Sequence, residues 1–515
     1  MNTNKPLTVL ILSAGYGRRM GPFSRMVNKG LIPYDNKPLI SHIIDKFPTD
    51  TKFVIGCGHM GQQVKDYVGN VHSEKNIVFV DIPDYSEGNT GPATTIQHCA
   101  EHLKGGFLWL ACDTLFDFDY TSRMDHNWIG VYPVDSTISQ DYCWVTRDGD
   151  DIVDVKNKIA SPRAVDAFIG LMYAKDDEYL NNLQRVGAKD TFEGFPGLEL
   201  KAHTVKNWLD FGTYEKWQEL SVELPEISFP KPDELFYHDN GKIVKYFTKE
   251  EHATRRWARA GKNSQCMPGN VQAVGNFLIH DYAVGDIVYN QYTPNVYRAM
   301  LDWCETKLWV APFDLDEKNI YSSCRNFYYD KTMDRVDQLR IKYSDWSECT
   351  EVNGYPVENI DTYLSKIDWK WLCTSTEWRF IHGDLHFDNT IYDAATQQFT
   401  AIDWRTDFAG NIYGDLYYDL AKMLGGLWLS YKAVKQDLIG YEEVNDRCTI
   451  SVPSIDNAEV YQEILKTWVI KQGLDWQKVI TLVPIIYLNM SPLHEAPFDK
   501  FLVALSQLHF SRVLK

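Results

Sequence analysis

The sequence lacks the long apolar runs and the basic surplus that mark two large classes of protein. Nowhere in its 515 residues do about 18 apolar residues follow one another, so we expect no membrane-spanning helix. The apolar run at 7–12 is too short to cross a bilayer and predicts a buried strand. Lysine and arginine number 52 against 70 acidic residues, and the net charge of −18 argues against a general nucleic-acid binder. We therefore expect a soluble, cytoplasmic protein with no nucleic-acid partner and no membrane insertion.

Three common motifs are also missing. The ten cysteines form no C-x-x-C pair, which argues against zinc ribbons and thioredoxin-like chemistry and favours reduced core thiols. No G-x-x-x-x-G-K-[ST] sequence occurs, so the chain has no Walker A loop. Gly15 and Gly17 begin a G-x-G-x-x-G pattern, but Met20 stands where the third glycine belongs. A dinucleotide site is therefore disfavoured.

What the sequence does contain is an ordinary globular composition with a clear alternation in its first part. Hydrophobic residues make up 44% and charged residues 24%. The length suits about two to four domains. Strand-like segments at 7–13, 52–57, 77–81 and 107–111 alternate with helical patterns at 39–46, 61–68 and 93–103. This alternation predicts a mostly parallel sheet that is covered by helices on both faces.

The pattern changes at a stretch with three prolines, residues 223–233 (ELPEISFPKPD), which predicts a linker. After it, strand-like segments at 235–238 and 242–247 flank the turn Asp239-Asn240-Gly241, a strong signal for a β-hairpin. From about residue 417 the periodicity is mainly helical. We therefore predict two catalytic domains, at 1–224 and 225–515.

A glycine turn with two cations follows the first predicted strand. Residues 13–21 read SAGYGRRMG, and glycines at a strand end let the backbone approach a phosphate or a base. Arg19 lies in this segment, and Lys29 comes shortly after it. Glycines of this kind also form plain tight turns. Two cations close behind such a turn nevertheless suit a triphosphate.

Two aspartates suggest a metal site in the same domain. Asp113 follows the strand-like segment 107–111, so it should lie at the carboxyl end of a strand, where α/β sheets bind ligands. Asp210 lies in the segment WLDFGT at 208–213. Magnesium is typically held by one or two carboxylates together with substrate phosphates. Either aspartate alone is more often a turn or cap residue, so the pair carries the prediction.

Residues 9–40, with SAGYGRRM followed by NKGLIPYDNKPLI, resemble the signature of the sugar-phosphate nucleotidyltransferase family, which includes the phosphocholine cytidylyltransferases. The resemblance extends over about residues 6–220 and implies a single Rossmann-like α/β domain. It also implies a nucleotide loop at Ala14, Gly15 and Gly17. Gly91, in GNTGPAT, matches the segment that usually touches the base.

The same resemblance implies roles for charged residues. The implied triphosphate and catalytic residues are Arg19 and Lys29, and the implied Mg²⁺ ligands are Asp113 and Asp210. Lys158 matches the lysine that contacts the acceptor phosphate, with Lys156 as a rival. Gly30 stands where the family usually has proline or alanine, which leaves the detailed shape of the loop open.

The C-terminal half contains the most specific motif of the chain, FIHGDLHFDN at 380–389 followed by FTAIDWR at 399–405. An aspartate, an asparagine five residues later and a second aspartate after a short strand form the arrangement of kinases. Asp384 would accept the proton of the substrate hydroxyl. Asn389 and Asp403 would hold Mg²⁺ on the phosphates of ATP.

The same segment allows a second interpretation. His382, His386 and Asp388 are residue types that bind zinc, and two histidines four residues apart can share a metal on a helix. Gly383 and the kinase spacing favour a loop over a helix, so the zinc alternative is disfavoured.

Residues from about 233 to 515 resemble the aminoglycoside phosphotransferase and choline kinase family, which implies a bilobal, kinase-like α+β domain. Residues 414–421 (GDLYYDLA) match a family helix start that is expected to be structural. Lys245 fits the strand lysine that pairs with ATP phosphates, with Glu251 as its helix partner and Glu250 as the alternative. Asp281 lies in the segment NFLIHDYA at 276–283, which resembles the strand leading into the adenine-binding hinge.

A kinase makes a phosphoester, and a nucleotidyltransferase consumes one together with a nucleoside triphosphate. We therefore predict a bifunctional enzyme that uses ATP, a second nucleotide and Mg²⁺ at both sites. Its activated product would serve surface polysaccharide or lipid decoration. The sequence leaves a homo-oligomer open. The alternative of another class is that one domain is degenerate and acts as a regulatory or binding module.

We predict a choline-like alcohol as the acceptor and CTP as the nucleotide, which gives a CDP-activated product; the alternative is a sugar, which gives an NDP-sugar. A quaternary ammonium needs an aromatic cage, although clustered aromatics more often form a core. The candidates for such a cage are Tyr142, Trp144, Trp369, Trp371 and Trp378.

Overall fold

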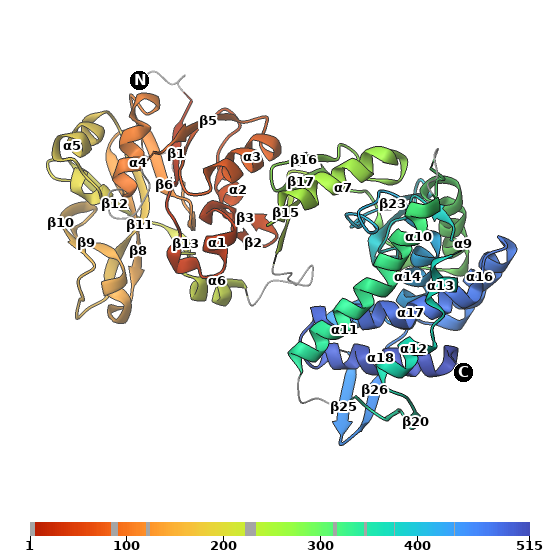
Figure 1. The fold of residues 1–515 in the computed structure, drawn as a ribbon. Coiled ribbons are helices and arrows are strands. Elements are labelled where there is room, and N and C mark those ends of the chain that lie inside the picture. The colour runs from red at the N-terminus through yellow and green to blue at the C-terminus, as the bar shows by residue number, and fades with distance from the viewer. Residues whose placement is uncertain are drawn as a thin grey trace. The chain divides into compact units, whose positions relative to one another are not determined.

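The computed structural model describes residues 6–83, 91–119, 124–221, 233–312, 317–343, 348–374, 376–436 and 438–514. The chain forms two compact units (Figure 1). Unit 1 comprises residues 1–250 and 273–279, and unit 2 comprises residues 251–272 and 280–515. The predicted linker at 223–233 falls almost wholly outside the described residues. Each unit is considered by itself below.

A large mixed sheet organises unit 1, with the strand order β5-β4-β1-β6-β11-β8-β12-β10-β9. Its strands are β1 (Thr8–Ser13), β4 (Lys52–Cys57), β5 (Asn76–Asp81), β6 (Phe107–Ala111), β8 (Asn127–Val134), β9 (Cys143–Asp148), β10 (Asp151–Asn157), β11 (Val165–Ala174) and β12 (Leu200–Thr204). Strands β5, β4, β1 and β6 are parallel, as the alternation predicts. The expectation of a mostly parallel sheet is wrong beyond β6, because β11 runs antiparallel to β6, β8 and β9. These later strands follow one another with few intervening helices, so they do not build parallel crossovers.

Both faces of this sheet are covered, as predicted. Successive side chains of β1 point to opposite faces, so Val9 and Ile11 join one apolar cluster while Leu10 joins another. Helices α2 (Leu39–Ile44) and α3 (Gly61–Val71) pack in the first cluster. Helices α4 (Pro92–His98) and α5 (Glu178–Val186) pack in the second. The core therefore has two layers, one on each side of the parallel strands.

The predicted hairpin is present as β14 (Glu234–Asp239) and β15 (Lys242–Phe247). It packs with unit 1, because Tyr237 and Tyr246 belong to the same apolar cluster as α3. The Tyr237 hydroxyl donates to the Leu31 carbonyl at 2.7 Å. The boundary between the two compact units therefore differs from the predicted division at 224/225, because unit 1 extends to residue 250 and includes residues 273–279. That division concerns catalytic domains, and it stays a prediction.

Unit 2 is largely helical, as the periodicity predicts for its last part. Its longer helices are α7 (Glu250–Lys262), α9 (Pro294–Trp303), α10 (Glu317–Arg325), α11 (Lys331–Lys342), α14 (Leu416–Trp428), α16 (Ala458–Lys471), α17 (Trp476–Met490) and α18 (Phe498–Val513). Helix α17 packs against α11, α14 and α18. The hairpin β22 (Thr390–Asp393) and β23 (Gln398–Ala401) follows the kinase-like motif. A second hairpin, β25 (Gly440–Val444) and β26 (Arg447–Ser451), interrupts the helices where the sequence indicated none. In the part of the chain that the structure describes, no helix has the length and apolarity to cross a membrane.

Candidate active sites

The glycine turn of unit 1 follows β1 as predicted. Gly17 has a φ of +61°, a conformation that favours glycine. Gly15 is different, because a Cβ there would meet no described atom within 4 Å. Packing therefore does not require glycine at position 15. At position 17 the positive φ favours glycine. The Ala14 carbonyl accepts a hydrogen bond from the backbone N–H of His59 at 2.9 Å, which fixes the start of the loop.

A buried asparagine, which the sequence analysis did not single out, holds this loop together. Asn28 Oδ1 accepts from the Ser13 hydroxyl at 2.7 Å and from the Gly30 N–H at 2.9 Å. Asn28 Nδ2 donates to the carbonyls of Ser13 and His59. A Cβ at Gly30 would lie 3.2 Å from the Ser13 hydroxyl oxygen, so glycine fits this position closely. The departure at Gly30 thus matches a tightly packed loop.

Lys29 and Asp113 form an ion pair at the end of β6. Burial raises the pKa of Asp113, but Lys29, and to a smaller extent Arg19, outweigh it and hold this pKa below its ordinary value. Three of the predicted residues therefore share one electrostatic environment. Arg19 is itself exposed, so it is accessible to a ligand.

Strand pairing brings Asp210 to the same place. Strand β13 (Lys206–Asp210) runs antiparallel to β7 (Thr114–Asp117), with Asp210 opposite Thr114. The N–H of Phe211 donates to the carbonyl of Asp113 at 3.0 Å. Two aspartates that lie far apart in sequence therefore occupy neighbouring backbone positions. Together they are a donor set that fits Mg²⁺ with bound phosphates. Their assignment as metal ligands stays a prediction.

Asp210 has two partners that give this site its polar network. Asp210 accepts from the Tyr142 hydroxyl at 2.8 Å and forms an ion pair with Lys216 of α6 (Tyr214–Ser221). Lys216 Nζ also donates to the Tyr142 hydroxyl at 2.5 Å. Burial lowers the pKa of Lys216, but Asp210 and Tyr142 outweigh it, so the net shift is upward. Lys216 carried no motif signal, and only the fold shows that it joins Asp210.

The two rival lysines have different surroundings. Lys158 adopts a φ of +54°, and its N–H donates to the carbonyl of Tyr142 at 3.0 Å, which holds it beside the Asp210 network. Lys156 forms an ion pair with exposed Asp154 at 2.5 Å. The exposed side chain of Lys158 therefore remains the better candidate for an acceptor phosphate.

Gly91 stands at the start of α4. A Cβ there would come 2.2 Å from the carbonyl oxygen of Lys189, so the local packing excludes any larger residue. This close packing accounts for the glycine without a ligand. The predicted contact of Gly91 with a base stays a prediction.

In unit 2 the predicted base, Asp384, forms a buried ion pair with Lys422 of α14 at 2.7 Å. Burial raises the pKa of Asp384, but Lys422 outweighs this effect and holds the pKa far below its ordinary value. Asp384 is therefore a carboxylate over the whole physiological pH range. Lys422 follows the GDLYYDLA segment and was not predicted as a site residue.

The hairpin β22–β23 brings the two predicted metal ligands of unit 2 together. Asn389 immediately precedes β22, and Asp403 follows β23 by two positions. The N–H of Ile402 donates to the carbonyl of Asn389 at 3.0 Å, which joins the two segments. Asn389 Nδ2 donates to the carbonyl of Asp384 at 2.9 Å. Asn389 and Asp403 thus lie at one end of the hairpin, beside Asp384, and supply oxygen donors that fit Mg²⁺.

Buried side chains fix the Asp384 loop through hydrogen bonds to its backbone. Asp419 accepts from the N–H groups of His382 and Gly383, both at 2.7 Å, and from the indole of Trp309 at 3.0 Å. Burial raises the pKa of Asp419 to about 6. The segment containing Asp419 was expected to be structural, and it positions the loop.

Two further buried groups complete this support. Arg259 of α7 donates to the carbonyls of Ile381 and Arg405, which flank Asp384 and Asp403 respectively. His382 accepts from the Asp384 N–H through Nδ1 at 3.2 Å, so its Nε2 donates to the Ile402 carbonyl at 2.8 Å. Burial lowers the pKa of His382 to about 3. Both ring nitrogens are engaged by the backbone, which leaves none for the disfavoured zinc alternative.

The predicted ATP-contact residues outside this loop are distributed over both units. Lys245 lies on β15 in unit 1, with its ammonium 6.0 Å from the ring centre of Phe236. Glu251 of α7 in unit 2 forms an ion pair with Arg255 at 3.7 Å. Asp281 ends β17 (Phe277–Asp281) and accepts from the Asn270 side chain at 2.7 Å. Their assignments to nucleotide binding stay predictions, as does that of Glu250.

The aromatic residues proposed for a cation cage are engaged by other groups. Lys216 lies over the ring of Tyr142 at 4.8 Å, and Lys478 lies over that of Trp371 at 5.6 Å. The indole N–H of Trp144 donates to the Ile159 carbonyl, and that of Trp369 to the Leu364 carbonyl. Two of these rings therefore already face a lysine.

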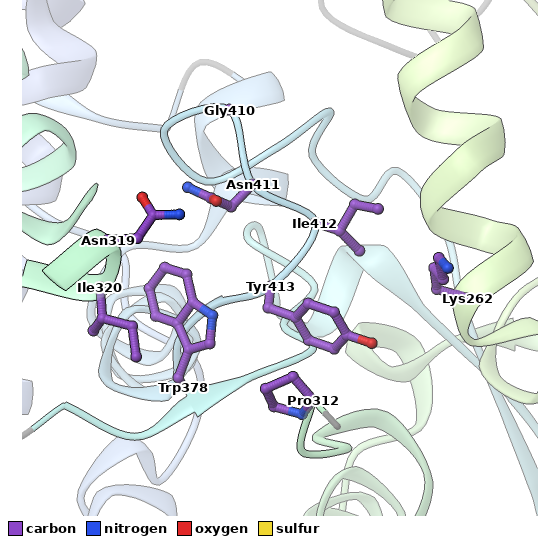
Figure 2. A pocket seen from close by; sticks show the side chains of 9 residues that line it. All are labelled: Lys262, Pro312, Asn319, Ile320, Trp378, Gly410, Asn411, Ile412 and Tyr413. Carbon is purple, nitrogen blue, oxygen red and sulfur yellow. The ribbon is translucent and has the colours of Figure 1, made fainter. Parts of the chain in front are cut away.

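The fifth aromatic residue, Trp378, lines a cavity of about 400 Å³ in unit 2. Figure 2 shows Trp378 and Tyr413 as its two aromatic walls and Lys262 of α7 at one side. The ammonium of Lys262 disfavours a cationic ligand there. The role of Trp378 in a quaternary-ammonium cage stays a prediction, which this lysine does not favour.

Comparison with known proteins finds two family matches, one in each part of the chain. Residues 9–148 match the family described as MobA-like NTP transferase domain, and residues 319–447 match the phosphotransferase enzyme family. The chain thus carries a nucleotidyltransferase domain followed by a phosphotransferase domain, which confirms both predicted resemblances. The coarse fold prediction, a mixed α/β protein with these two domains, is confirmed with them.

Individual relatives match part of the chain. The chain is 27% identical over 132 residues to the bifunctional protein GlmU of Methanococcus vannielii, which covers 25% of this chain and 30% of that protein. It is 25% identical over 129 residues to a UTP–glucose-1-phosphate uridylyltransferase of Synechocystis, which covers 23% and 33%. The chain thus spans about a third of the length of each. A solved UDP-glucose pyrophosphorylase with UDP-glucose aligns with a TM-score of 0.36 and 16% identity, over 42% of this chain and 97% of that one.

Proposed function

We propose that the chain phosphorylates a small alcohol with ATP in unit 2 and then transfers a nucleotidyl group to the resulting phosphoester in unit 1. The observation that carries the proposal is that each half has its own set of charged residues suited to phosphoryl chemistry. Unit 2 places Asp384, Asn389 and Asp403 at one end of a hairpin. In unit 1, Asp113 immediately precedes β7, and Asp210 ends β13, which pairs with β7. Two such sets also argue against a degenerate domain.

In the first step, the acceptor hydroxyl oxygen forms a bond to the γ-phosphorus of ATP while the bond to the leaving oxygen of ADP breaks. Asp384 accepts the hydroxyl proton. Its low pKa makes it a weak base, which suffices because phosphoryl transfer needs positioning more than base strength. Asn389 and Asp403 would hold Mg²⁺, which supplies neutralisation of phosphate charge when bound.

In the second step, a phosphoester oxygen forms a bond to the α-phosphorus of the nucleotide, and pyrophosphate leaves. No proton transfer is required, so charge neutralisation and alignment dominate. Lys29 and Arg19 would bind the triphosphate, and Lys158 would bind the phosphoester. Asp113 and Asp210 would hold Mg²⁺, and Lys216 would orient Asp210.

The resemblance to phosphocholine cytidylyltransferases predicts choline as the acceptor and CTP as the nucleotide, with a sugar as the alternative. Two observations favour a polyol or sugar instead. Lysines face Tyr142 and Trp371 and flank the cavity at Trp378, where a cage would need free rings. In addition, one relative is named for glucose-1-phosphate and UTP.

The test is a product analysis by mass spectrometry. The protein is incubated with ATP and Mg²⁺, each of CTP, UTP, GTP and dTTP in turn, and a panel of choline, ethanolamine, glycerol and sugars. We expect an NDP-linked product that requires both ATP and one of these nucleotides. If no combination of substrates gave either a phosphoester or an NDP-linked product, the proposal would be contradicted.

A further inference from the structure

The surroundings of Asp384 contain more positive charge than one carboxylate can balance. Lys422 binds Asp384 directly. Lys331 and Arg405 both lie over the ring of Phe327, with Nζ at 4.2 Å and the guanidinium carbon at 5.1 Å from the ring centre. Arg335 lies one helical turn beyond Lys331 on α11. Lys331, Arg405 and Lys422 thus lie near the predicted base, and Arg335 lies beside Lys331 and Arg405.

Among the described residues, few acidic side chains balance the charge of these cations. Arg335 donates to Gln338, a neutral side chain, at 2.7 Å. The Arg405 Nε is buried and has no hydrogen-bond partner in the described part of the chain. Burial and the three neighbouring cations lower the pKa of Lys331, and Asp384 alone opposes them. An arrangement of this kind gains stability when an anion binds to it.

The position of the cluster places that anion next to the reacting hydroxyl. A Cβ at Gly383 would lie 2.6 Å from Arg405 Cδ, so the Arg405 side chain passes directly beside the residue that precedes Asp384. Phe327 stacks on Phe408 at 4.0 Å, which gives Lys331 and Arg405 a rigid apolar platform. Lys331, Arg335 and Arg405 are partly accessible, whereas Lys422 is buried against Asp384.

We propose that the alcohol phosphorylated in unit 2 carries an anionic group, a carboxylate or a phosphate, which Lys331, Arg335 and Arg405 bind while its hydroxyl faces Asp384. This inference rests on the proposed kinase function and narrows its substrate class. A cationic alcohol such as choline would meet a surplus of positive charge at this place, which like-charge repulsion disfavours. The second source of negative charge is the γ-phosphate of ATP itself, and the experiment separates the two.

The experiment measures ADP release with matched pairs of acceptors: glycerol against glycerate and glycerol phosphate, and glucose against glucuronate and glucose 6-phosphate, with choline as the cationic member. We expect kcat/KM to be about tenfold or more higher for an anionic member than for its neutral partner, corresponding to at least about 1.4 kcal/mol. Preference for glycerol, glucose or choline would overturn the inference and leave the kinase function intact. If none of the acceptors in the panel supported ADP release, both the inference and the proposed kinase function would be overturned.

Variants then locate the anion. Lys331→Met and Arg335→Met should each raise the KM of the anionic acceptor about tenfold and leave the KM of ATP unchanged, and Lys331→Arg should restore most of the loss. Arg340→Met is the matched control, because it removes a charge from the same helix where Arg340 pairs with Asp361. A rise in the KM of ATP, with the acceptor KM unchanged, would assign the cluster to ATP and overturn the inference.

Discussion

The two candidate sites are built in different ways. In unit 2 the reacting groups come from one short segment and the hairpin that follows it, and buried residues hold this segment from behind. In unit 1 the groups come from segments that lie far apart in the sequence, and the pairing of β13 with β7 brings Asp113 and Asp210 together. A local site can be read from a motif, whereas a distributed site depends on the fold. We expect mutations of the supporting residues to have different effects in the two sites.

The largest expected effect is at the support of the unit 2 loop. Asp419→Ala removes the acceptor of three buried N–H donors, each worth about 1–3 kcal/mol when left unpaired. We expect the free energy of unfolding of unit 2 to fall by about 3 kcal/mol or more, and ADP formation to fall with it. Nucleotidyl transfer to a supplied phosphoester should stay at the wild-type level.

Denaturant unfolding and both activity assays measure this change. Asp393→Ala is the control, because Asp393 accepts its hydrogen bonds within the turn at the far end of β22. Equal losses in the two variants would show that Asp419 has no special role in positioning.

The corresponding residue of unit 1 is Asn28. Asn28→Ala removes four hydrogen bonds to Ser13, Gly30 and His59, and we expect a loss of about 2–3 kcal/mol in the stability of unit 1. Nucleotidyl transfer should fall while ADP formation persists. Asn70→Ala, which removes a single bond to a backbone carbonyl on α3, serves as the control. A wild-type unfolding midpoint for the Asn28 variant would contradict this account of the loop.

A third prediction concerns pH and unit 2. His509 stacks on Trp428 at 4.4 Å, and burial lowers its pKa to about 3. The folded state therefore keeps it neutral while the unfolded chain takes up a proton below about pH 6.5, so stability falls as the pH falls. Between pH 6.5 and 5.0 this residue should cost about 2 kcal/mol.

His509→Phe keeps a ring for the stack and removes the titration. We expect the variant to lose less stability than the wild type on acidification, as measured by denaturant titrations at pH 7.5, 6.5 and 5.0. Parallel pH dependences in the two proteins would refute the assignment, whatever the stability of the variant at pH 7.5.

The smallest expected effect compares two neighbouring lysines of unit 1. Lys158→Met should raise the KM for the phosphoester about tenfold, because it removes a charge-assisted contact worth about 1.5 kcal/mol. Lys156→Met should change it little, since Lys156 pairs with exposed Asp154. Steady-state pyrophosphate release measures both. The reverse ranking would reassign the acceptor contact to Lys156.

The sequence predicted the parts of the molecule that depend on local patterns. Strands β4 and β6 and the β14–β15 hairpin follow from apolar runs and a turn sequence. The kinase-like segment could be recognised because its chemistry lies within one stretch of chain. The antiparallel half of the sheet could not be predicted, because pairing of β11 with β6 and β8 is set by long-range packing.

The supporting residues of the sites were missed for the same physical reason. Asn28, Lys216 and Lys422 have ordinary side chains in ordinary sequence surroundings. They acquire a role only when folding brings them to Ser13, Asp210 and Asp384. Cation–carboxylate pairs of this kind leave no spacing signal, and only the structure reveals them.

We propose that one chain carries two separate active sites for successive reactions. The direct measurement is a crossed assay of Asp384→Asn and Asp113→Asn, with ADP formation from the alcohol and nucleotidyl transfer to a supplied phosphoester measured on each. We predict that Asp384→Asn abolishes only the first activity and that Asp113→Asn abolishes only the second. If either variant lost both activities while folded, or if both variants kept both, the claim would be contradicted.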